Sequence, residues 1–247
     1  MQNQQKIGSA IKKYHIRFDL EIIASLVKEK SKILDIGCGE GDLLKFLQKT
    51  KKINGKGLEI SQTEASIAMS KGISVIQGDA ENDLAYFPDN AFDYAILSQT
   101  LQATKEPDKL IAQMLRIAKY AIISFPNFAH FKNRLYLSVF GKMPVSKTIP
   151  YNWYDTPNIH FCSIQDFRNL CAKLGLSIRE SIYLNNYKKL GKFTSNKILS
   201  NLFAEYGIFL ITKNEINMAD EFEFSKEAER ELFSKKSANT ILANDKI

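Results

Sequence analysis

The sequence has little cysteine, and the few that it has are not arranged as a disulfide framework or a zinc site. Cys38, Cys162 and Cys171 are odd in number and form no C-x-x-C pair. No apolar run approaches the roughly 20 residues of a membrane span, and residues 1–13 lack the uninterrupted apolar core of a signal peptide. Internal repeats and low-complexity tracts are also missing. These absences predict reduced cysteines, no metal site, no membrane association and a cytoplasmic location.

The charge is unevenly distributed along the chain. The net charge is +7, yet residues 213–247 hold eight acids and six bases, which leaves 28 bases against 19 acids in residues 1–212. Four lysines form a local basic stretch: Lys188, Lys189, Lys192 and Lys197. Little aromatic interleaving and no known nucleic-acid module accompany them, so a solvated face or a docking surface for an acidic partner is favoured over nucleic acid.

Length and composition predict one globular core. The 247 residues are 45% hydrophobic and 25% charged, which are ordinary values for a folded domain. We expect a single α/β domain over residues 1–213. Residues 214–247 are expected to be a charged, partly disordered tail, with a short charged helix near 221–233.

A glycine loop is the strongest local signal in the chain. Residues 33–41, ILDIGCGEG, read as a short apolar strand that breaks into a tight turn and then a helix. Gly37, Gly39 and Gly41 tolerate positive φ and allow close approach of the backbone to a ligand, and the helix beginning near Glu40 directs its N–H groups there. The alternative is an ordinary strand-to-helix turn with acids that favour the helix dipole.

The charge of this loop indicates which ligand it suits. A dinucleotide fingerprint requires glycine at position 42, where this chain has Asp42. Asp35, Glu40 and Asp42 would repel a pyrophosphate unless a cation intervened. S-adenosylmethionine carries a sulfonium and an ammonium and no phosphate, so it fits better. Cys38, within the loop, is included among the expected cofactor contacts.

Further candidate cofactor residues follow the next strands. Glu59, with Ile60 after it, ends the second strand 22 residues beyond Gly37, close to the spacing at which an acid reaches ribose hydroxyls. The alternative is a surface acid before a helix. Ser98 and Gln99 follow the fourth strand, at the edge that faces the ligand crevice of a doubly wound sheet.

The spacing of apolar residues gives the rest of the fold. Helices are expected over 15–30, from the glycine loop to Asn54-Gly55, from the capping box at Ser61 to about 71, from Pro107 and over 164–174. Strands are expected over 33–36, 56–60, 73–77, 92–97, 120–125, 176–184 and 203–212. This pattern predicts a Rossmann-like, seven-stranded, mostly parallel sheet with a terminal antiparallel strand and helices on both faces.

One segment departs from this alternation. Residues 141–160 contain three prolines, two tyrosines and the only tryptophan, which is too apolar for a linker and predicts either a lid over the crevice or a binding surface. Aromatic anchors beside polar groups suit a substrate pocket and a protein interface equally. The residues concerned are Tyr151, Trp153, Tyr154, Asp155 and Asn158.

Several segments together resemble one family. They are LDIGCGEGDLL (34–44), VIQGD (75–79), FPDNAFDYAILSQTLQA (87–103), ISFPNFAHF (123–131) and GKMPVSKTIPYNWYDTPNIHFCSIQDF (141–167). Over about residues 15–212 the chain resembles the methionine biosynthesis protein MetW family. The glycine motif is shared with a vast superfamily, whereas SQTLQA and PYNWYDTPNIH are specific to this family.

The resemblance implies a class I methyltransferase fold that binds S-adenosylmethionine or S-adenosylhomocysteine. It also implies that Asp79, before Ala80, binds the exocyclic amine of the adenine. The alternative is an ordinary aspartate in a turn. The implied partner is the homoserine O-acyltransferase MetX, in the first committed step of methionine synthesis. Fold alone does not imply methyl transfer, so a methyltransferase active on a small molecule or a protein stays the alternative.

No obligatory catalytic triad is expected, because methyl transfer mainly needs alignment of the nucleophile with the methyl group. If an acid or base takes part, His130 and His160 have a suitable unperturbed pKa. Each is more often a structural histidine. The N/D-P-P-Y/F signature of many nucleic-acid methyltransferases is missing, since the fourth strand ends in LSQT.

Overall fold

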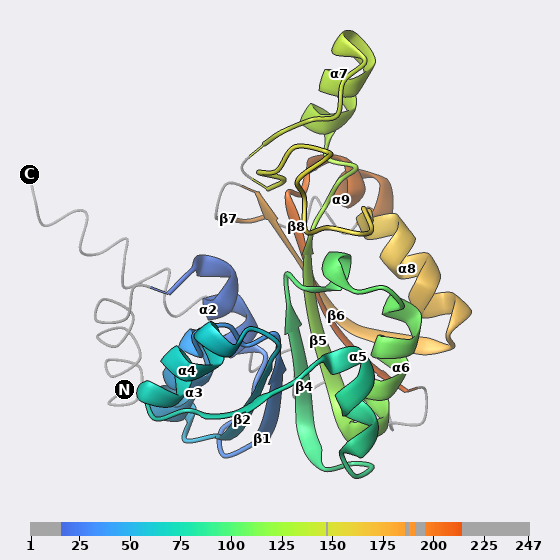
Figure 1. The fold of residues 1–247 in the computed structure, drawn as a ribbon. Helices are drawn as coiled ribbons and strands as arrows, with labels where there is room; N and C mark the ends of the chain where they lie inside the picture. The colour runs from blue at the N-terminus through green and yellow to red at the C-terminus, as the bar shows by residue number, and fades with distance from the viewer. Residues whose placement is uncertain (1–15, 147, 186–187, 191–195, 214–247) are drawn as a thin grey trace, which may run out of the picture.

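A computed structural model describes residues 16–146, 148–185, 188–190 and 196–213 (Figure 1). Eight strands in this part of the chain form one sheet in the order β3-β2-β1-β4-β5-β8-β6-β7. The strands are β1 (Lys32–Ile36), β2 (Asn54–Glu59), β3 (Ser74–Gln77), β4 (Phe92–Ser98), β5 (Ala118–Pro126), β6 (Leu176–Asn185), β7 (Lys188–Lys189) and β8 (Tyr206–Lys213). The predicted tail and its helix lie outside the described residues.

The sheet is parallel from β3 to β5 and antiparallel beyond it. β1 pairs in parallel with β2 and with β4, and β8 pairs antiparallel with both β5 and β6. Strand order therefore reverses between β1 and β4, and a crevice at their carboxyl ends is where α/β sheets of this kind bind ligands.

The predicted fold class is confirmed, but the predicted strand count is wrong. The eighth strand is β7, whose two residues pair with Leu184 and Asn185 of β6. It lies in a lysine- and asparagine-rich stretch, and two residues are too few to show any hydrophobic alternation.

Helices cover both faces of the sheet. They are α2 (Phe18–Ser25), α3 (Asp42–Lys51), α4 (Gln62–Ser70), α5 (Ala80–Asp83), α6 (Pro107–Ile117), α7 (Phe131–Phe140), α8 (Ile164–Lys173) and α9 (Lys197–Phe203), with 3-10 turns η1 (Leu84–Tyr86) and η2 (Leu101–Ala103). Ile33 of β1 packs with α2 and α3, whereas Leu34 and Ile36 pack with α6 and α8. Alternate residues of β1 thus pack into two separate apolar cores, as expected for a sheet buried on both faces.

Three predicted boundaries are wrong. The helix α3 ends at Lys51 because Lys52 takes the left-handed conformation, with φ of 52°, so Asn54 and Gly55 begin β2 instead of ending the helix. Helix α2 covers only Phe18–Ser25, and Phe203 belongs to α9 rather than to the last strand.

Ser61 caps α4 in only one direction. Its hydroxyl accepts a hydrogen bond from the Glu64 N–H at 3.4 Å, while its own N–H donates to Glu59 Oε1 at 2.9 Å. A reciprocal capping box instead starts α8, where Ser163 and Asp166 satisfy one another.

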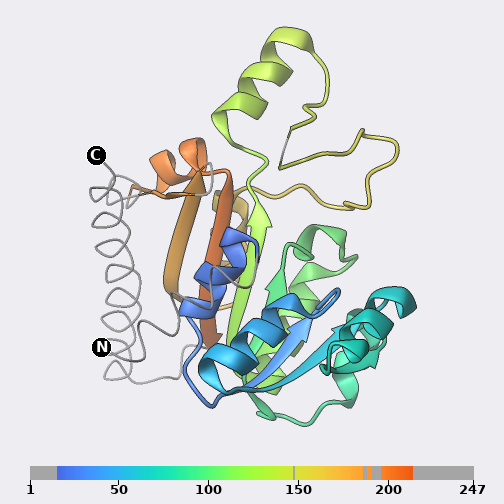
Figure 2. The ribbon, with the colours of Figure 1, turned by 90° about the vertical axis from the view of Figure 1, so that its left-hand side faces the viewer.

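Helix α7 stands clear of both helical layers. Figures 1 and 2, at right angles to one another, show it projecting from the end of β5, with the following chain folded beneath it. Among the helices of the described ranges, none is long and apolar enough to cross a membrane.

Candidate functional site

The glycine loop lies where strand order reverses, and its glycines have backbone angles that other residues rarely adopt. φ is +67° at Gly37, +54° at Gly39 and +76° at Gly41. The Gly37 N–H donates to the Leu58 carbonyl at 2.8 Å, and a Cβ at Gly37 would lie 2.8 Å from Thr100 Oγ1. Glycine is therefore required both for the backbone angle and for space.

The Glu59 carboxylate ties β2 to this loop. Oε2 accepts the Gly39 N–H at 2.8 Å, Oε1 accepts the Ser61 N–H at 2.9 Å, and the residue is 6% exposed. An ionised carboxylate has about four acceptor positions, and the two backbone donors leave others for hydroxyl groups. The predicted ribose role is compatible with this geometry and stays a prediction.

Two of the three loop carboxylates, Glu40 and Asp42, share a cation. Lys71 Nζ lies 2.8 Å from Glu40 Oε2 and 2.9 Å from Asp42 Oδ1, so a cation does intervene at the outer rim of the loop. The Glu40 hydrogen bond is the main factor that raises the pKa of Lys71. The negative charge that faces inward comes from Asp35 and Glu59.

Asp35 is a buried carboxyl at the end of β1. Burial is the largest cause that raises its pKa to about 7, the Glu59 charge adds to the rise, and the Arg17 charge opposes it. This carboxyl consequently changes charge near neutral pH, and a bound cation would favour the ionised form.

Arg17 and Asp19, at the start of α2, were not predicted as site residues, and they contact the residues at the end of β4. Arg17 forms an ion pair with Asp19 at 2.9 Å, and its guanidinium lies 3.4 Å from Ser98 Oγ. Gln99, with φ of +55°, donates its side-chain amide to Asp19 Oδ2 at 2.8 Å. The predicted residues Ser98 and Gln99 are therefore held by partners about 80 positions away, for which the sequence gives no local signal.

The Cys38 side chain is buried, and its thiol stays protonated near neutral pH. Burial, followed by the charges of Asp35 and Glu59, raises the pKa of its thiol to about 12. Its side chain occupies the space that a Cβ at Gly57 would need. The Cys38 side chain therefore packs against Gly57, and the predicted contact of Cys38 with a cofactor stays a prediction.

The turn after β3 lies beside the end of β2. The Gly78 N–H donates to the Glu59 carbonyl at 3.0 Å. Asp79 caps α5 by accepting the Glu81 N–H at 3.0 Å, and Ala80 is the first residue of that helix. Ile60, the residue after Glu59, is 67% exposed.

The two histidines have separate surroundings. His130 is buried, caps α7 by accepting the Lys132 N–H at 3.4 Å, and has its pKa lowered chiefly by burial. His160 is exposed, and its Nε2 lies 3.1 Å from the Lys105 carbonyl. These hydrogen-bond partners lie outside the glycine loop, and a catalytic role for either histidine stays a prediction.

The aromatic segment, residues 141–160, is hydrogen-bonded to the rest of the protein near residue 160 and is exposed around residues 153 and 154. Ile159 and His160 both donate their N–H groups to the Gln102 carbonyl in η2, at 2.7 and 3.0 Å. Trp153 and Tyr154 are 73% and 72% exposed and contact one another edge to face. Two hydrogen bonds form within this part of the segment. The Asn152 side-chain amide donates to Asp155 at 3.2 Å, and the Asn158 N–H donates to Thr156 at 3.1 Å. Tyr151 is 45% exposed.

Comparison with known proteins agrees with the resemblance in the sequence. The family model described as "Methionine biosynthesis protein MetW" matches residues 17–211. The chain belongs to the MetW family. The match begins at Arg17 and ends within β8, so it covers the glycine loop, the crevice and the aromatic segment.

A curated relative joins MetW to a second protein. The bifunctional methionine biosynthesis protein MetXA/MetW of Rhodopirellula baltica is 34% identical over 177 residues, which cover 68% of this chain. The present MetW chain spans only 28% of the length of that relative.

Solved structures share the fold of this MetW chain. A S-adenosylmethionine-dependent methyltransferase from Thermotoga maritima has a TM-score of 0.57 at 21% identity, covering 85% of this chain and 96% of its own. The cyclase SpnF has a TM-score of 0.55 at 20% identity, covering 79% and 80%. The fold is that of class I methyltransferases, and the cyclase illustrates that this fold hosts other chemistry.

Proposed function

We propose that this MetW protein binds S-adenosylmethionine or S-adenosylhomocysteine at the glycine loop and serves as an accessory protein to a homoserine O-acyltransferase, MetX, at the first committed step of methionine synthesis. The observation that carries the nucleoside proposal is the Glu59 carboxylate, fixed by the Gly39 and Ser61 N–H groups at the carboxyl end of β2, beside the glycine loop. The joined MetXA/MetW relative supports the choice of partner.

The residues of the crevice suit a cationic nucleoside. Glu59 would accept the ribose hydroxyls, Ile60 and the turn at Asp79–Ala80 would contact the adenine, and the loop from Gly37 to Gly41 would approach the amino-acid moiety. Asp35 and Glu59 supply negative charge in a buried setting, where charge interacts more strongly than in water. A bound S-adenosylmethionine would bring a sulfonium and an electrophilic methyl group to this position.

An accessory role is proposed ahead of methyl transfer because a curated MetW relative is joined to MetXA. Acid and base groups do not separate the two roles, since the pKa of Asp35 is raised to about 7 and burial favours the neutral imidazole of His130, which can accept a proton. Since inversion at a methyl carbon needs mainly alignment, a direct test must look for the transferred methyl group.

The experiment combines two purified proteins and two readouts. Acyl transfer from an acyl-coenzyme A to homoserine is measured for the acyltransferase alone, with this protein, and with both this protein and S-adenosylmethionine. Labelled cofactor reports any methyl transfer in the same mixtures. Stimulated acyl transfer without label transfer supports the accessory role.

Other results would refute it. Label on a small carboxylate or a protein, with the acyltransferase indifferent to the mixture, would make methyl transfer the function. If the nucleoside changes the affinity of this protein for the acyltransferase, linkage requires the acyltransferase to change nucleoside affinity by the same factor, which calorimetry measures. Calorimetry that finds no nucleoside binding, with or without the partner, would exclude the cofactor proposal.

A further inference from the structure

Helix α7 exposes five apolar side chains that its own fold does not cover. The α7 surface comprises Leu135, Tyr136, Leu137, Val139 and Phe140, each between 39% and 63% exposed. The helix projects from the body of the molecule in both orthogonal views (Figures 1 and 2). Contiguous exposed apolar residues of this kind mark interaction sites on folded proteins.

The apolar residues occupy more than one side of the helix. At about 100° per residue, they span an arc of about 200°, and only Arg134 and Ser138 occupy the remaining sector of these turns. A helix that is apolar over most of its circumference is normally buried on several sides. This arrangement fits a groove that encloses the helix better than a flat surface.

The dimensions and pattern of α7 argue against a lipid bilayer. Its ten residues extend only about 15 Å, about half of the hydrocarbon thickness. A helix lying in the membrane interface carries a strongly charged polar face rich in Lys and Arg opposite its apolar face, whereas the polar sector of these turns of α7 holds one base, Arg134, beside Ser138.

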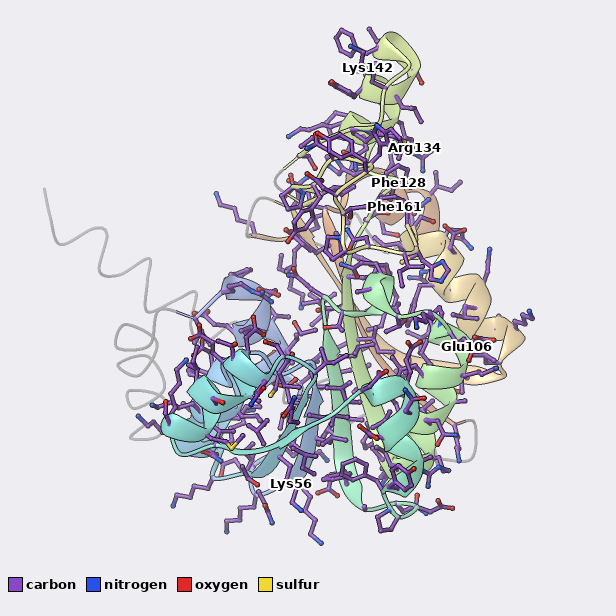
Figure 3. The ribbon with its side chains drawn as sticks, viewed as in Figure 1. Lys56, Glu106, Phe128, Arg134, Lys142 and Phe161 are labelled. Carbon is purple, nitrogen blue, oxygen red and sulfur yellow. The ribbon has the colours of Figure 1, made fainter. Side chains whose placement is uncertain are left out.

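The charge around α7 is of one sign. Residues 127–154 contain four bases and no acid, and the exposed bases Lys132, Arg134 and Lys142 lie on α7 or directly after it. Figure 3 shows Arg134 and Lys142 on the projecting part of the molecule. Two copies packed through this surface would bring like charges together, whereas a partner with an acidic rim would be complementary.

The base of the helix is fixed in place. His130 caps it, the Asn133 side-chain amide donates to the Phe128 carbonyl at 3.0 Å, and the Phe128 and Phe161 rings lie 4.8 Å apart. Phe128 and Phe161 mark this junction in Figure 3. A helix anchored in this way loses little conformational entropy on binding, which favours affinity.

We infer that the α7 surface inserts into an apolar groove with an acidic rim on the acyltransferase partner. This inference rests on the proposed function and assigns the part of the chain that makes the complex. Binding of a largely apolar helix in a groove is a common mode of protein recognition. The basic residues would orient the helix, and its apolar residues would supply most of the affinity.

The test measures the affinity of the full-length chain for the purified acyltransferase by calorimetry. Leu137→Asp and Phe140→Asp place a charge on the α7 surface and should each weaken the complex by at least about tenfold. Tyr86→Asp is the matched control, since Tyr86 is an 85% exposed aromatic residue in η1. It should leave the affinity unchanged.

Two further measurements separate folding and charge effects. Melting temperature and S-adenosylmethionine affinity should be the same for wild type and for all three variants, because the altered side chains are exposed. Arg134→Glu should weaken the complex by about threefold to tenfold at low salt and less at high salt, as expected for a charge at the rim.

The outcomes distinguish this inference from the proposed function. If both Asp variants bind the acyltransferase with wild-type affinity, the role of the α7 surface is refuted but the complex is not. If the wild-type protein forms no complex, both the α7 inference and the proposed accessory role are refuted. Sedimentation with anionic phosphatidylglycerol vesicles, lost in Phe140→Asp, would reassign the surface to lipid. A dimer of the protein alone that Phe140→Asp dissociates would reassign it to a second copy.

Discussion

The glycine loop and the α7 surface differ in whether their side chains have partners within the protein. At the loop, the Glu59 carboxylate accepts hydrogen bonds from two backbone N–H groups, and the carboxylates of Glu40 and Asp42 both pair with Lys71. At α7, five apolar side chains face solvent. The loop holds its shape through internal contacts, as a small-molecule site must, whereas α7 presents the kind of surface that a macromolecular partner covers.

The largest expected effect tests the internal support of the loop. Glu59→Ala removes the acceptor of the Gly39 and Ser61 N–H groups, so it should lower the free energy of unfolding by about 1–3 kcal/mol. It should also weaken S-adenosylmethionine binding at least about tenfold, because two charge-assisted hydrogen bonds to the ribose would be lost. Calorimetry and thermal melting measure both.

Glu106→Ala is the control for this change, since Glu106 is an exposed acid at the start of α6 whose side chain pairs with Lys109. It should alter neither quantity appreciably. Unchanged nucleoside affinity in Glu59→Ala would leave Glu59 a structural role only.

A second prediction uses the charge of Asp35. With a pKa raised to about 7, this carboxyl is mostly neutral at pH 6 and ionised at pH 8. Affinity for cationic S-adenosylmethionine should therefore rise with pH below about 7, by up to about tenfold per pH unit, and level off above it. Uncharged 5′-methylthioadenosine should show a much weaker dependence, as should Asp35→Asn with either ligand.

The same carboxyl predicts a change in stability with the opposite sign. Between about pH 4 and pH 7 the folded protein binds more protons at Asp35 than the unfolded chain does. Its contribution to the free energy of unfolding therefore falls as pH rises through this window. Asp35→Asn should flatten that part of the profile, and an identical profile in the variant would contradict the assignment.

A third prediction sharpens the contrast between the two regions. If the aromatic segment, residues 141–160, is a binding surface for the partner and not a lid, Trp153→Ala should weaken partner binding by at least about fivefold, as truncation of an interface aromatic does. Nucleoside affinity and melting temperature should not change, because Trp153 is 73% exposed. A fall in all three would reassign the tryptophan to the folded core.

The smallest expected effect concerns the rim of the loop. Lys71→Ala removes a partly exposed cation from Glu40 and Asp42 and should change stability by less than about 1 kcal/mol. The rim becomes more negative, so S-adenosylmethionine should bind about twofold tighter at low salt, with the gain lost at high salt. Weaker binding would show that Lys71 contacts the ligand.

Local patterns predicted much of the fold and the position of the loop. The β/α alternation, the glycine turn and the strand-end location of Glu59 depend on periods and turn chemistry within about ten residues. The boundary at Lys52 was missed because a lysine, rather than a glycine, takes the left-handed conformation. The two-residue β7 was missed because it pairs through its backbone alone and carries no pattern.

The amino-acid sequence by itself determined the fold class, the family and the loop where a ligand is expected, because these depend on residue types in a fixed local order. Only the tertiary structure decided which charges meet. It brings Lys71 to Glu40 and Asp42, and it brings Arg17 to Ser98, 81 positions away. It also decided that α7 projects with its apolar residues exposed, since burial depends on which elements the sheet order places above a helix rather than on the helix sequence.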